Sequence, residues 1–182
     1  MAKNKIVVVC LLWLFAGIHT DLQGALSQSQ KTKAKSEKEI RVSVIDTALS
    51  QIGVREATGK NDGKAVEKYL KVCGLGKGYA WCAAFISWVY KVNKVSEFKT
   101  AWAPGWFPKT KTVKHDLAEP GDVFGIWINN RIGHVGLVYV WGDKVVRTIE
   151  GNTNDAGSRE GDGVYEKRRL RRQIYAVSKW IN

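Results

Sequence analysis

The sequence has few cysteines, few prolines and no hydrophobic run of the length that crosses a bilayer. Its 182 residues include three cysteines and three prolines. Three cysteines cannot by themselves form a disulfide framework or a four-ligand zinc site. A content of 45% hydrophobic and 25% charged residues excludes a disordered, collagen-like or low-complexity chain. A chain of this length fits one domain with a self-supporting hydrophobic core.

Acidic residues are scarce as well. The chain has 29 Lys+Arg against 17 Asp+Glu, which gives a formal net charge of +12 at pH 7. This excess favours an anionic partner but does not identify its class. No sequence repeat is visible at a period of 20–50 residues, which argues against a repeat architecture.

The first 25 residues have the pattern of a secretory signal peptide. Two lysines precede an apolar run of 13 residues from Ile6 to Ile18, and a polar stretch follows it. A transmembrane helix needs about 20 apolar residues, so this run is short for a span. We expect cleavage after Gly24 or Ala25, and the alternative is an uncleaved membrane anchor. Cleavage after residue 25 removes two lysines and one aspartate, which leaves an exported chain with a net charge of +11 and no stable membrane span.

The spacing of apolar residues predicts a helical half followed by a strand half. Residues 26–39 are polar and rich in lysine, which predicts a solvated linker into a domain over residues 40–182. Helical spacing recurs over residues 40–52, 65–73 and 81–92. The last of these segments has no charge between Trp81 and Tyr90, so we expect a central helix that is buried on most sides.

From residue 119 onward, the apolar period changes to that of strands. We expect strands over residues 123–128, 134–141, 145–150, 164–169 and 174–180. Helices followed by a meander of strands predict an α+β fold with an antiparallel sheet.

Cys82, at the start of the predicted central helix, is the candidate nucleophile. A thiol in the first turn of a helix faces unpaired N–H groups and the positive end of the helix dipole, which lower its pKa. The same N–H groups can contribute to an oxyanion hole. One alternative is that Cys82 is a small core residue. Another is that export allows a disulfide with Cys73, which would abolish the chemistry.

A thiolate nucleophile also needs a base and a group that orients the base. His115 lies in a lysine-rich loop, where we expect it to be exposed. His134 opens a strand, and Glu150 and Asn152 close the next one. A strand-borne histidine beside polar residues of the adjacent strand is the arrangement that a cysteine nucleophile requires. The alternative is that residues 150–152 are an ordinary strand end.

Such a site requires one particular register between the two strands. Residues directly opposite each other on antiparallel strands share a face. A two-residue turn at Gly142 and Asp143 would place Glu150 on the face away from His134. A longer connection or a bulge would instead place His134 opposite Asn152, with Glu150 on the same face. The catalytic interpretation therefore predicts a longer connection or a bulge.

Four segments, in this order, resemble the CHAP domains, which are cysteine- and histidine-dependent amidohydrolases/peptidases related to the NlpC/P60 enzymes. The segments are Trp81-Cys82-Ala83-Ala84-Phe85-Ile86-Ser87-Trp88, Pro120-Gly121-Asp122, Gly133-His134-Val135-Gly136-Leu137-Val138 and Ile149-Glu150-Gly151-Asn152. The resemblance covers roughly Ile40 to the C-terminus. It implies a papain-like fold and a bacterial peptidoglycan hydrolase.

By the same resemblance, Cys82 would be the nucleophile, His134 the general base, and Glu150 and Asn152 the groups that orient the imidazole. The enzyme would cut an amide bond of the wall through a thioester intermediate. This bond would be either the one between N-acetylmuramic acid and L-alanine or one within the stem peptide or cross-bridge. A non-catalytic wall-binding module on the same fold is the alternative.

Further residues are candidates for contact with the substrate. Tyr79 is also a candidate oxyanion donor, whereas Trp81 fits the core better. Trp102 and Trp106 are candidates for stacking on sugar rings. The others are Glu56, Asn61 and Asp62.

We expect no cofactor and no metal. Some CHAP domains carry an acidic calcium loop, but residues 59–63 hold one carboxylate beside a lysine, which is too little charge for calcium. The basic run at residues 167–172 would attract an anionic wall polymer, or alternatively would be a solvated strand and turn. We expect a monomer whose partners are peptidoglycan and an inhibitor or immunity protein. Export and the lack of a binding motif argue against nucleic acid.

Overall fold

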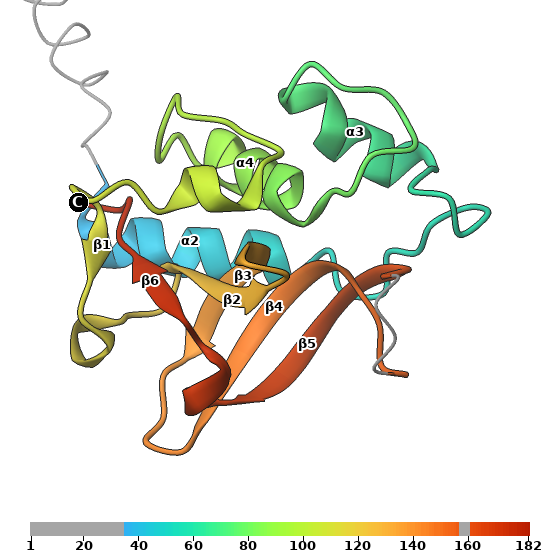
Figure 1. Cartoon of the computed structure of the whole chain (residues 1–182). Helices are drawn as coiled ribbons and strands as arrows, with labels where there is room; N and C mark the ends of the chain where they lie inside the picture. The colour runs from blue at the N-terminus through green and yellow to red at the C-terminus, as the bar shows by residue number, and fades with distance from the viewer. Residues whose placement is uncertain (1–34, 157–160) are drawn as a thin grey trace, which may run out of the picture. The chain divides into compact units, whose positions relative to one another are not determined.

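The computed structural model describes residues 35–156 and 161–182, so the expected signal peptide and the expected linker up to residue 34 lie outside the described residues. Three α-helices come first in the described chain: α2 (Glu37–Leu49), α3 (Lys64–Val72) and α4 (Cys82–Val92). A six-stranded sheet in the order β1-β6-β2-β3-β4-β5 follows them (Figure 1). Its strands are β1 (Thr112–Val113), β2 (Val123–Ile128), β3 (Arg131–Val140), β4 (Val145–Thr153), β5 (Gly163–Leu170) and β6 (Ala176–Ser178).

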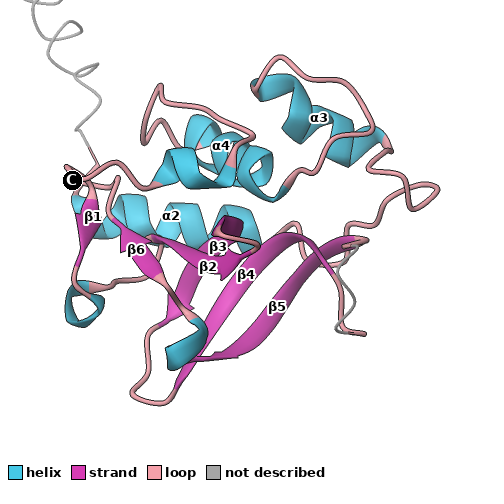
Figure 2. Ribbon diagram, viewed as in Figure 1, coloured by secondary structure: helices cyan, strands magenta, loops and turns pink. Residues whose placement is uncertain are grey.

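Every strand pair in this sheet is antiparallel, and the three helices lie along one side of it (Figure 2). The predicted α+β fold is therefore confirmed. Short 3₁₀ turns at Ala103–Trp106, His115–Leu117 and Arg171–Gln173 complete the connections. Among the described helices, none combines the length and apolar character needed to cross a membrane.

Apolar side chains on the strands alternate between the two faces of the sheet and so form two hydrophobic clusters. The larger one joins the helices to strand residues such as Val123, Leu137 and Ile149. Their sequence neighbours Phe124 and Val138 belong to the smaller cluster instead. Successive side chains point to opposite faces of a sheet, so both faces of its centre carry apolar side chains.

Helix α2 begins three residues earlier than the spacing of apolar residues predicts. Ser36 caps it: the backbone N–H of Glu39 donates to Oγ of Ser36 (3.3 Å), and the backbone N–H of Ser36 donates to the Glu39 carboxylate (2.7 Å). This is a capping box, which satisfies two N–H groups that the helix cannot satisfy itself. Helix α2 and its cap therefore occupy the last residues of the expected linker, from Ser36 onward.

The central helix is α4, as predicted. Eight of its 11 residues are buried, including Ala83 and Ala84, whose small side chains let the sheet approach its first turn. Trp81 precedes the helix and makes no side-chain capping hydrogen bond. The N–H groups of the first turn are thus not used by a cap, which leaves them available to the thiol of Cys82.

A bulge in β3 sets the register between β3 and β4. Val138 pairs with Thr148 and Val140 pairs with Arg147, so Tyr139 is an extra residue on β3. On the far side of the bulge, Leu137 pairs with Ile149. Continuing that register brings His134 opposite Asn152 and places Glu150 on the His134 face. The bulge that the catalytic interpretation required is therefore confirmed.

The Pro120-Gly121-Asp122 segment anchors helices α2 and α4 to the start of β2. The guanidinium of Arg41, on α2, donates to Oδ1 of Asp122 (2.8 Å) and to the carbonyl of Pro120 (2.9 Å). Asp122 has no exposed surface. The hydroxyl of Tyr90, on α4, donates to the carbonyl of Gly121 (2.7 Å). This motif is therefore explained by packing rather than by contact with the candidate site.

We predict that Arg41→Met lowers the free energy of unfolding by about 3–5 kcal/mol, because it leaves the Asp122 carboxylate buried without its partner. Urea denaturation measures the change. The matched control is Arg147→Met, since Arg147 pairs with Glu166 at the surface with 44% of its side chain exposed. That change should cost far less, because solvent screens an exposed ion pair. Equal losses in the two variants would contradict a structural role for the buried pair.

Candidate active site

Cys82 lies at the inner end of a cleft between the start of α4 and the sheet. The cleft has a volume of about 350 Å³, and His134, Asn152, Arg131, Arg169 and Asn61 are among its lining residues. Burial by itself would raise the pKa of the Cys82 thiol. A hydrogen bond and charge interaction with His134, together with the backbone N–H groups of Val135 and Ala83, outweigh burial and lower it.

The imidazole of His134 bridges the thiol and a carboxylate. Its Nε2 lies 2.8 Å from Oε2 of Glu150, which leaves Nδ1 as the ring nitrogen for Cys82. Burial would lower the pKa of His134, but the hydrogen bonds and charges of Cys82 and Glu150 raise it to about 10. A lowered thiol pKa beside a raised imidazole pKa favours a thiolate–imidazolium pair.

A second bulge in β3 explains why a glycine precedes His134. Ile126 pairs with His134 and Trp127 pairs with Ile132, so Gly133 is an extra residue on β3. A Cβ atom at Gly133 would lie 2.8 Å from Cβ of Ile128, which is closer than real Cβ contacts allow. Gly133 therefore forms a bulge that sets the direction of the His134 imidazole. Only glycine fits this position without displacing β2.

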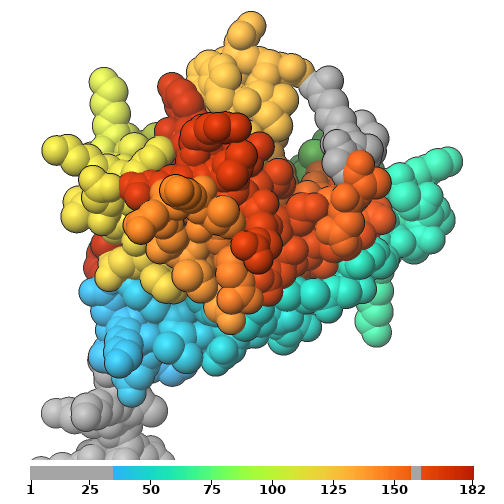
Figure 3. All heavy atoms as spheres, turned by 90° about the horizontal axis from the view of Figure 1, so that it is seen from below, coloured from blue at the N-terminus to red at the C-terminus, as the bar shows by residue number. Residues whose placement is uncertain are grey.

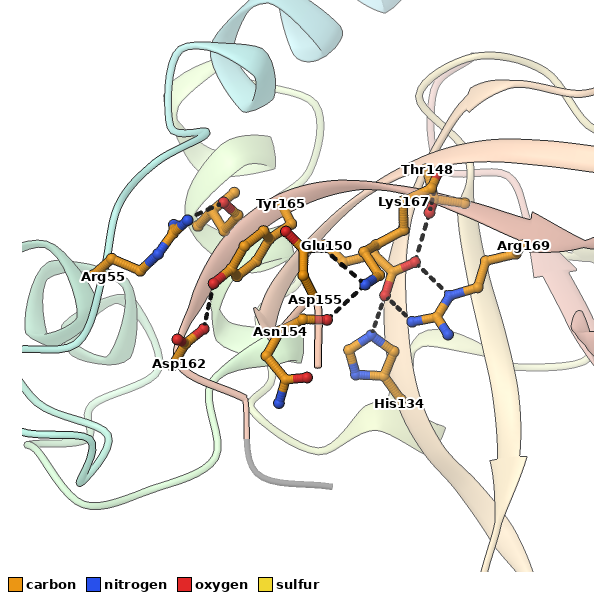
Figure 4. A network of polar contacts seen from close by, with 11 residues as sticks. Arg55, His134, Thr148, Glu150, Asn154, Asp155, Asp162, Tyr165, Lys167 and Arg169 are labelled. Atoms are coloured by element: carbon orange, nitrogen blue, oxygen red, sulfur yellow. Dashed lines mark hydrogen bonds and ion pairs between the residues drawn. The ribbon is translucent and has the colours of Figure 1, made fainter. Parts of the chain in front are cut away.

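The carboxylate of Glu150 is fully buried, and charged and polar groups surround it (Figure 4). Arg169, on β5, donates from Nε to Oε1 (2.9 Å) and from a terminal nitrogen to Oε2 (2.5 Å). The hydroxyl of Thr148 donates to Oε1 (2.5 Å). Burial would raise the pKa of Glu150, but Arg169 and His134 lower it well below its usual range. The carboxylate therefore stays charged beside the imidazole.

Arg169 is the site residue that the sequence analysis missed, because it assigned residues 167–172 to a solvated or polymer-binding run. On β5 the alternate residue Lys167 also points inward and donates to the carbonyl of Asn154 (2.6 Å). Arg171 lies in the 3₁₀ turn after β5 and donates to Asp116 (2.5 Å). Arg168 and Arg172 are exposed. The signal that could have found Arg169 is the strand alternation, because even and odd positions of a basic run point to opposite faces.

Glycine at position 151 brings β4 against the start of α4. A Cβ atom there would lie 2.7 Å from the Trp81 ring and 2.9 Å from Cβ of Phe85. Asn152 follows with a left-handed backbone (φ 55°) and lines the cleft. Within the described residues, the imidazole is hydrogen-bonded to Glu150, and no such bond joins it to Asn152. The orienting role is therefore supported by contact for Glu150 and stays a prediction for Asn152.

Two tryptophans that were predicted to contact substrate are instead core residues. Trp106 has no exposed surface and packs edge-on against Tyr90 and Trp180. Trp81 is also fully buried, and its indole N–H donates to the Glu56 carboxylate (2.8 Å). Stacking on a sugar needs an exposed ring face, so the burial of both rings gives no support to their contact with substrate, and Trp81 lies in the core, where it fitted better.

The remaining candidates divide between the cleft and the outer surface. Asn61 lines the cleft, and its backbone N–H donates to Glu56 (2.8 Å), so Glu56 supports the loop and Trp81. Asp62 accepts hydrogen bonds from the backbone and hydroxyl of Thr58. Tyr79 and Trp102 are exposed and are not among the cleft-lining residues. Contact of Tyr79 with substrate stays a prediction, whereas the position of Trp102 outside the cleft gives no support to its expected role in sugar stacking.

Two further expectations concern Cys73 and His115. Cys73 and Cys82 are both free thiols, so the alternative of a disulfide between them is not realised. His115 is half-buried, with its ring 5.6 Å from that of Trp141, rather than exposed as expected. Within residues 35–156 and 161–182, no group of three or more His, Cys, Asp or Glu side chains could hold a metal.

The fold and the thiol–imidazole pair define an α+β domain with the layout of a papain-like cysteine site. The model of the CHAP domain family matches residues 74–152, a segment that contains Cys82, His134, Glu150 and Asn152. This segment is a CHAP domain, and the resemblance inferred from the sequence is confirmed. No curated protein matches the sequence.

Solved structures support the same fold. A mutated form of the Resuscitation Promoting Factor Interacting protein RipA has a TM-score of 0.53 at 14% identity, over 80% of this chain and 64% of that one. A hypothetical invasion protein of Mycobacterium tuberculosis has a TM-score of 0.53 at 15% identity, with the same shares, 80% and 64%. The peptidoglycan hydrolase RipB from Mycobacterium tuberculosis has a TM-score of 0.50 at 15% identity, over 89% and 78%. At 14–15% sequence identity, the similarity between this chain and these structures shows the fold alone.

We predict that iodoacetamide alkylates Cys82 with a midpoint below about pH 8.5, the value of a free thiol. His134→Ala should move that midpoint upward, because burial then acts on the thiol without the imidazole. Mass spectrometry of the modified peptides measures both rates. Cys73 is the internal control, since burial raises its pKa. Identical pH profiles for Cys73 and Cys82 would contradict the thiolate–imidazolium pair.

We predict that Arg169→Met reduces stability and also flattens its dependence on acid. The folded pKa of Glu150 is depressed, so its charge adds stability above the unfolded pKa of about 4.3, and this is lost as the pH falls toward the folded value. Without Arg169, the folded pKa moves back toward the unfolded one. The free energy of unfolding should therefore be lower near pH 7 and fall less between about pH 5 and pH 2.

Urea denaturation across this pH range measures the effect. The matched control is Arg168→Met, the exposed neighbour on the same strand. It should follow the wild-type pH dependence. A curve for Arg169→Met parallel to that of the wild type would mean that Arg169 does not hold the charge of Glu150.

Proposed function

We propose that this chain is a cysteine peptidoglycan hydrolase that cleaves an amide bond in the bacterial cell wall. One observation carries the proposal: Cys82 and His134 line the same cleft, and Nε2 of His134 lies 2.8 Å from the fully buried carboxylate of Glu150. A base within hydrogen-bond reach of the nucleophile, itself oriented by a third group, is the arrangement that activates a cysteine.

The first half of the proposed reaction forms a thioester. The thiolate of Cys82 attacks the carbonyl carbon of the amide, and the carbonyl oxygen becomes an oxyanion. The uncapped N–H groups at the start of α4 support that charge. The His134 imidazolium then donates its proton to the amine nitrogen as the carbon–nitrogen bond breaks. Glu150 keeps the imidazole in the orientation for this transfer.

The second half hydrolyses the thioester. Neutral His134 takes a proton from water, and the resulting hydroxide attacks the thioester carbon. The carbon–sulfur bond breaks, the carboxylic acid product leaves, and Cys82 returns as a thiolate beside imidazolium. The Arg169–Glu150 pair stabilises the imidazolium at the beginning and end of this cycle.

The family match and the charge of the cleft support peptidoglycan as the substrate class. Among the described residues, the side chains that line the cleft include Arg131 and Arg169 but no aspartate or glutamate. A cationic cleft suits the carboxylates of peptidoglycan stem peptides. The bond that is cut is either the amide between N-acetylmuramic acid and L-alanine or an amide within the stem peptide or cross-bridge.

We further propose that the protein is exported on its signal peptide and acts as a monomer in the periplasm, in the envelope or outside the cell. Its partner besides the wall would be an inhibitor or immunity protein. Amino-terminal sequencing of the processed chain tests export, with Ala25 or Leu26 expected as the first residue. Light scattering of the purified chain tests the monomer.

The decisive prediction concerns turnover. Mature protein from about Leu26, with purified peptidoglycan and a reductant, should release new amine ends, and Cys82→Ala and His134→Ala should each lose about 10³-fold or more of that rate. Mass spectrometry of the fragments measures release and identifies the bond. Cys73→Ala is the matched control and should retain the wild-type rate.

The non-catalytic alternative makes a different prediction for the same samples. A wall-binding module would bind several wall types without releasing fragments, and Cys82→Ala would leave binding unchanged. Binding without release in every sample would therefore replace the hydrolase with that alternative.

A further inference from the structure

A second groove adjoins the cleft that holds Cys82. It has a volume of about 440 Å³ and is lined by Ile126, Trp127, Arg169, Arg172, Gln173, Ile174 and Tyr175. Ile126 and Arg169 line the cleft as well. In the space-filling view, the red segment around residue 173 lies against the light-orange hairpin of β2 and β3, beside a hollow in the surface (Figure 3). A ligand longer than the cleft would extend into this groove.

Two exposed aromatic rings stand together in the second groove. Trp127 is 49% exposed and Tyr175 is 56% exposed, and their ring centroids are 4.6 Å apart. The backbone N–H of Tyr175 donates to the carbonyl of Gly125 (2.8 Å), which holds the tyrosine beside β2. Such rings combine a large apolar face with a polar tip, and this suits the C–H face of a pyranose. Trp102 is also exposed, but it lies in neither groove.

The charge along both grooves has one sign. Within residues 35–156 and 161–182, the charged side chains that line the two grooves are Arg131, Arg169 and Arg172, besides His134, and none is an aspartate or glutamate. Arg169 lies at the junction and is engaged with Glu150. A ligand that spans both grooves should therefore combine sugar rings with carboxylates. A glycan strand with an attached stem peptide has this chemistry.

We propose that Trp127, Tyr175 and Arg172 form a glycan-binding subsite, which holds the amino sugars whose stem peptide enters the Cys82 cleft. This inference rests on the proposed peptidoglycan hydrolase function and adds a requirement to it. The substrate is recognised through its sugar, so wall fragments that keep their sugars bind better than the same peptides without them.

The test compares Trp127→Ala and Tyr175→Ala with the matched control Trp102→Ala on soluble glycan–peptide fragments. The two groove variants should raise KM about 10-fold, the loss expected for one stacking ring, with little change in kcat. Trp102→Ala should leave both constants unchanged. Trp127→Phe keeps an aromatic face and should recover most of the affinity. Equal KM values for Trp127→Ala and Trp102→Ala would overturn the subsite.

A binding measurement separates failure of the subsite from failure of the hydrolase. Peptide-free glycan strands are titrated against Cys82→Ala protein, with the heat of binding in isothermal titration calorimetry as the readout. Binding that Trp127→Ala abolishes and Trp102→Ala preserves supports the subsite, even if no wall fragment is hydrolysed. Turnover of wall fragments without any glycan binding would keep the hydrolase and overturn the subsite.

Discussion

The buried carboxylate of Glu150 is the charge on which the rest of the site depends. An unpaired carboxylate in a protein interior would be protonated or would destabilise the fold. Here Arg169 binds it through two nitrogens, Thr148 donates a hydroxyl, and His134 takes the remaining position. These partners come from β3, β4 and β5. The sheet therefore has to be assembled in the correct register before the imidazole is oriented toward the thiol.

Irregularities in the strands produce that register. Three bulges surround the site: Gly133 and Tyr139 are extra residues on β3, and the β4–β5 pairing shifts between Glu150 and Thr153. Each bulge changes which face the following side chains take. A regular hairpin between β3 and β4 would separate the imidazole from the carboxylate. The close approach of Gly151 to Trp81 and Phe85 then brings β4 against the start of α4, where the thiol lies.

Much of the fold and part of the site were predictable from the sequence. The helix at residues 81–92 and the strand at residues 123–128 were predicted to within one residue of the observed α4 and β2, because long apolar patterns with one period leave little choice. Cys82, His134 and Glu150 were identified by their places at the ends of such elements. The start of α2 was misplaced because its capping residues, Ser36 and Glu39, lie within a polar stretch that otherwise resembles a linker.

The residues that the sequence did not reveal are those whose role depends on distant neighbours. Arg169 occurs in a run of basic residues, and strand alternation separates it from the exposed Arg168 without telling which of the two faces Glu150. Trp106 and Trp127 are both tryptophans near turns, yet one is fully buried and the other is half exposed beside the cleft.

The sequence by itself determined the order and type of the elements and the chemistry they could carry, because local periodicity and residue type are properties of the chain. Which charged groups meet, and which aromatic rings face solvent, was decided by the tertiary structure. Strand pairing and bulges set those contacts between residues far apart in the sequence.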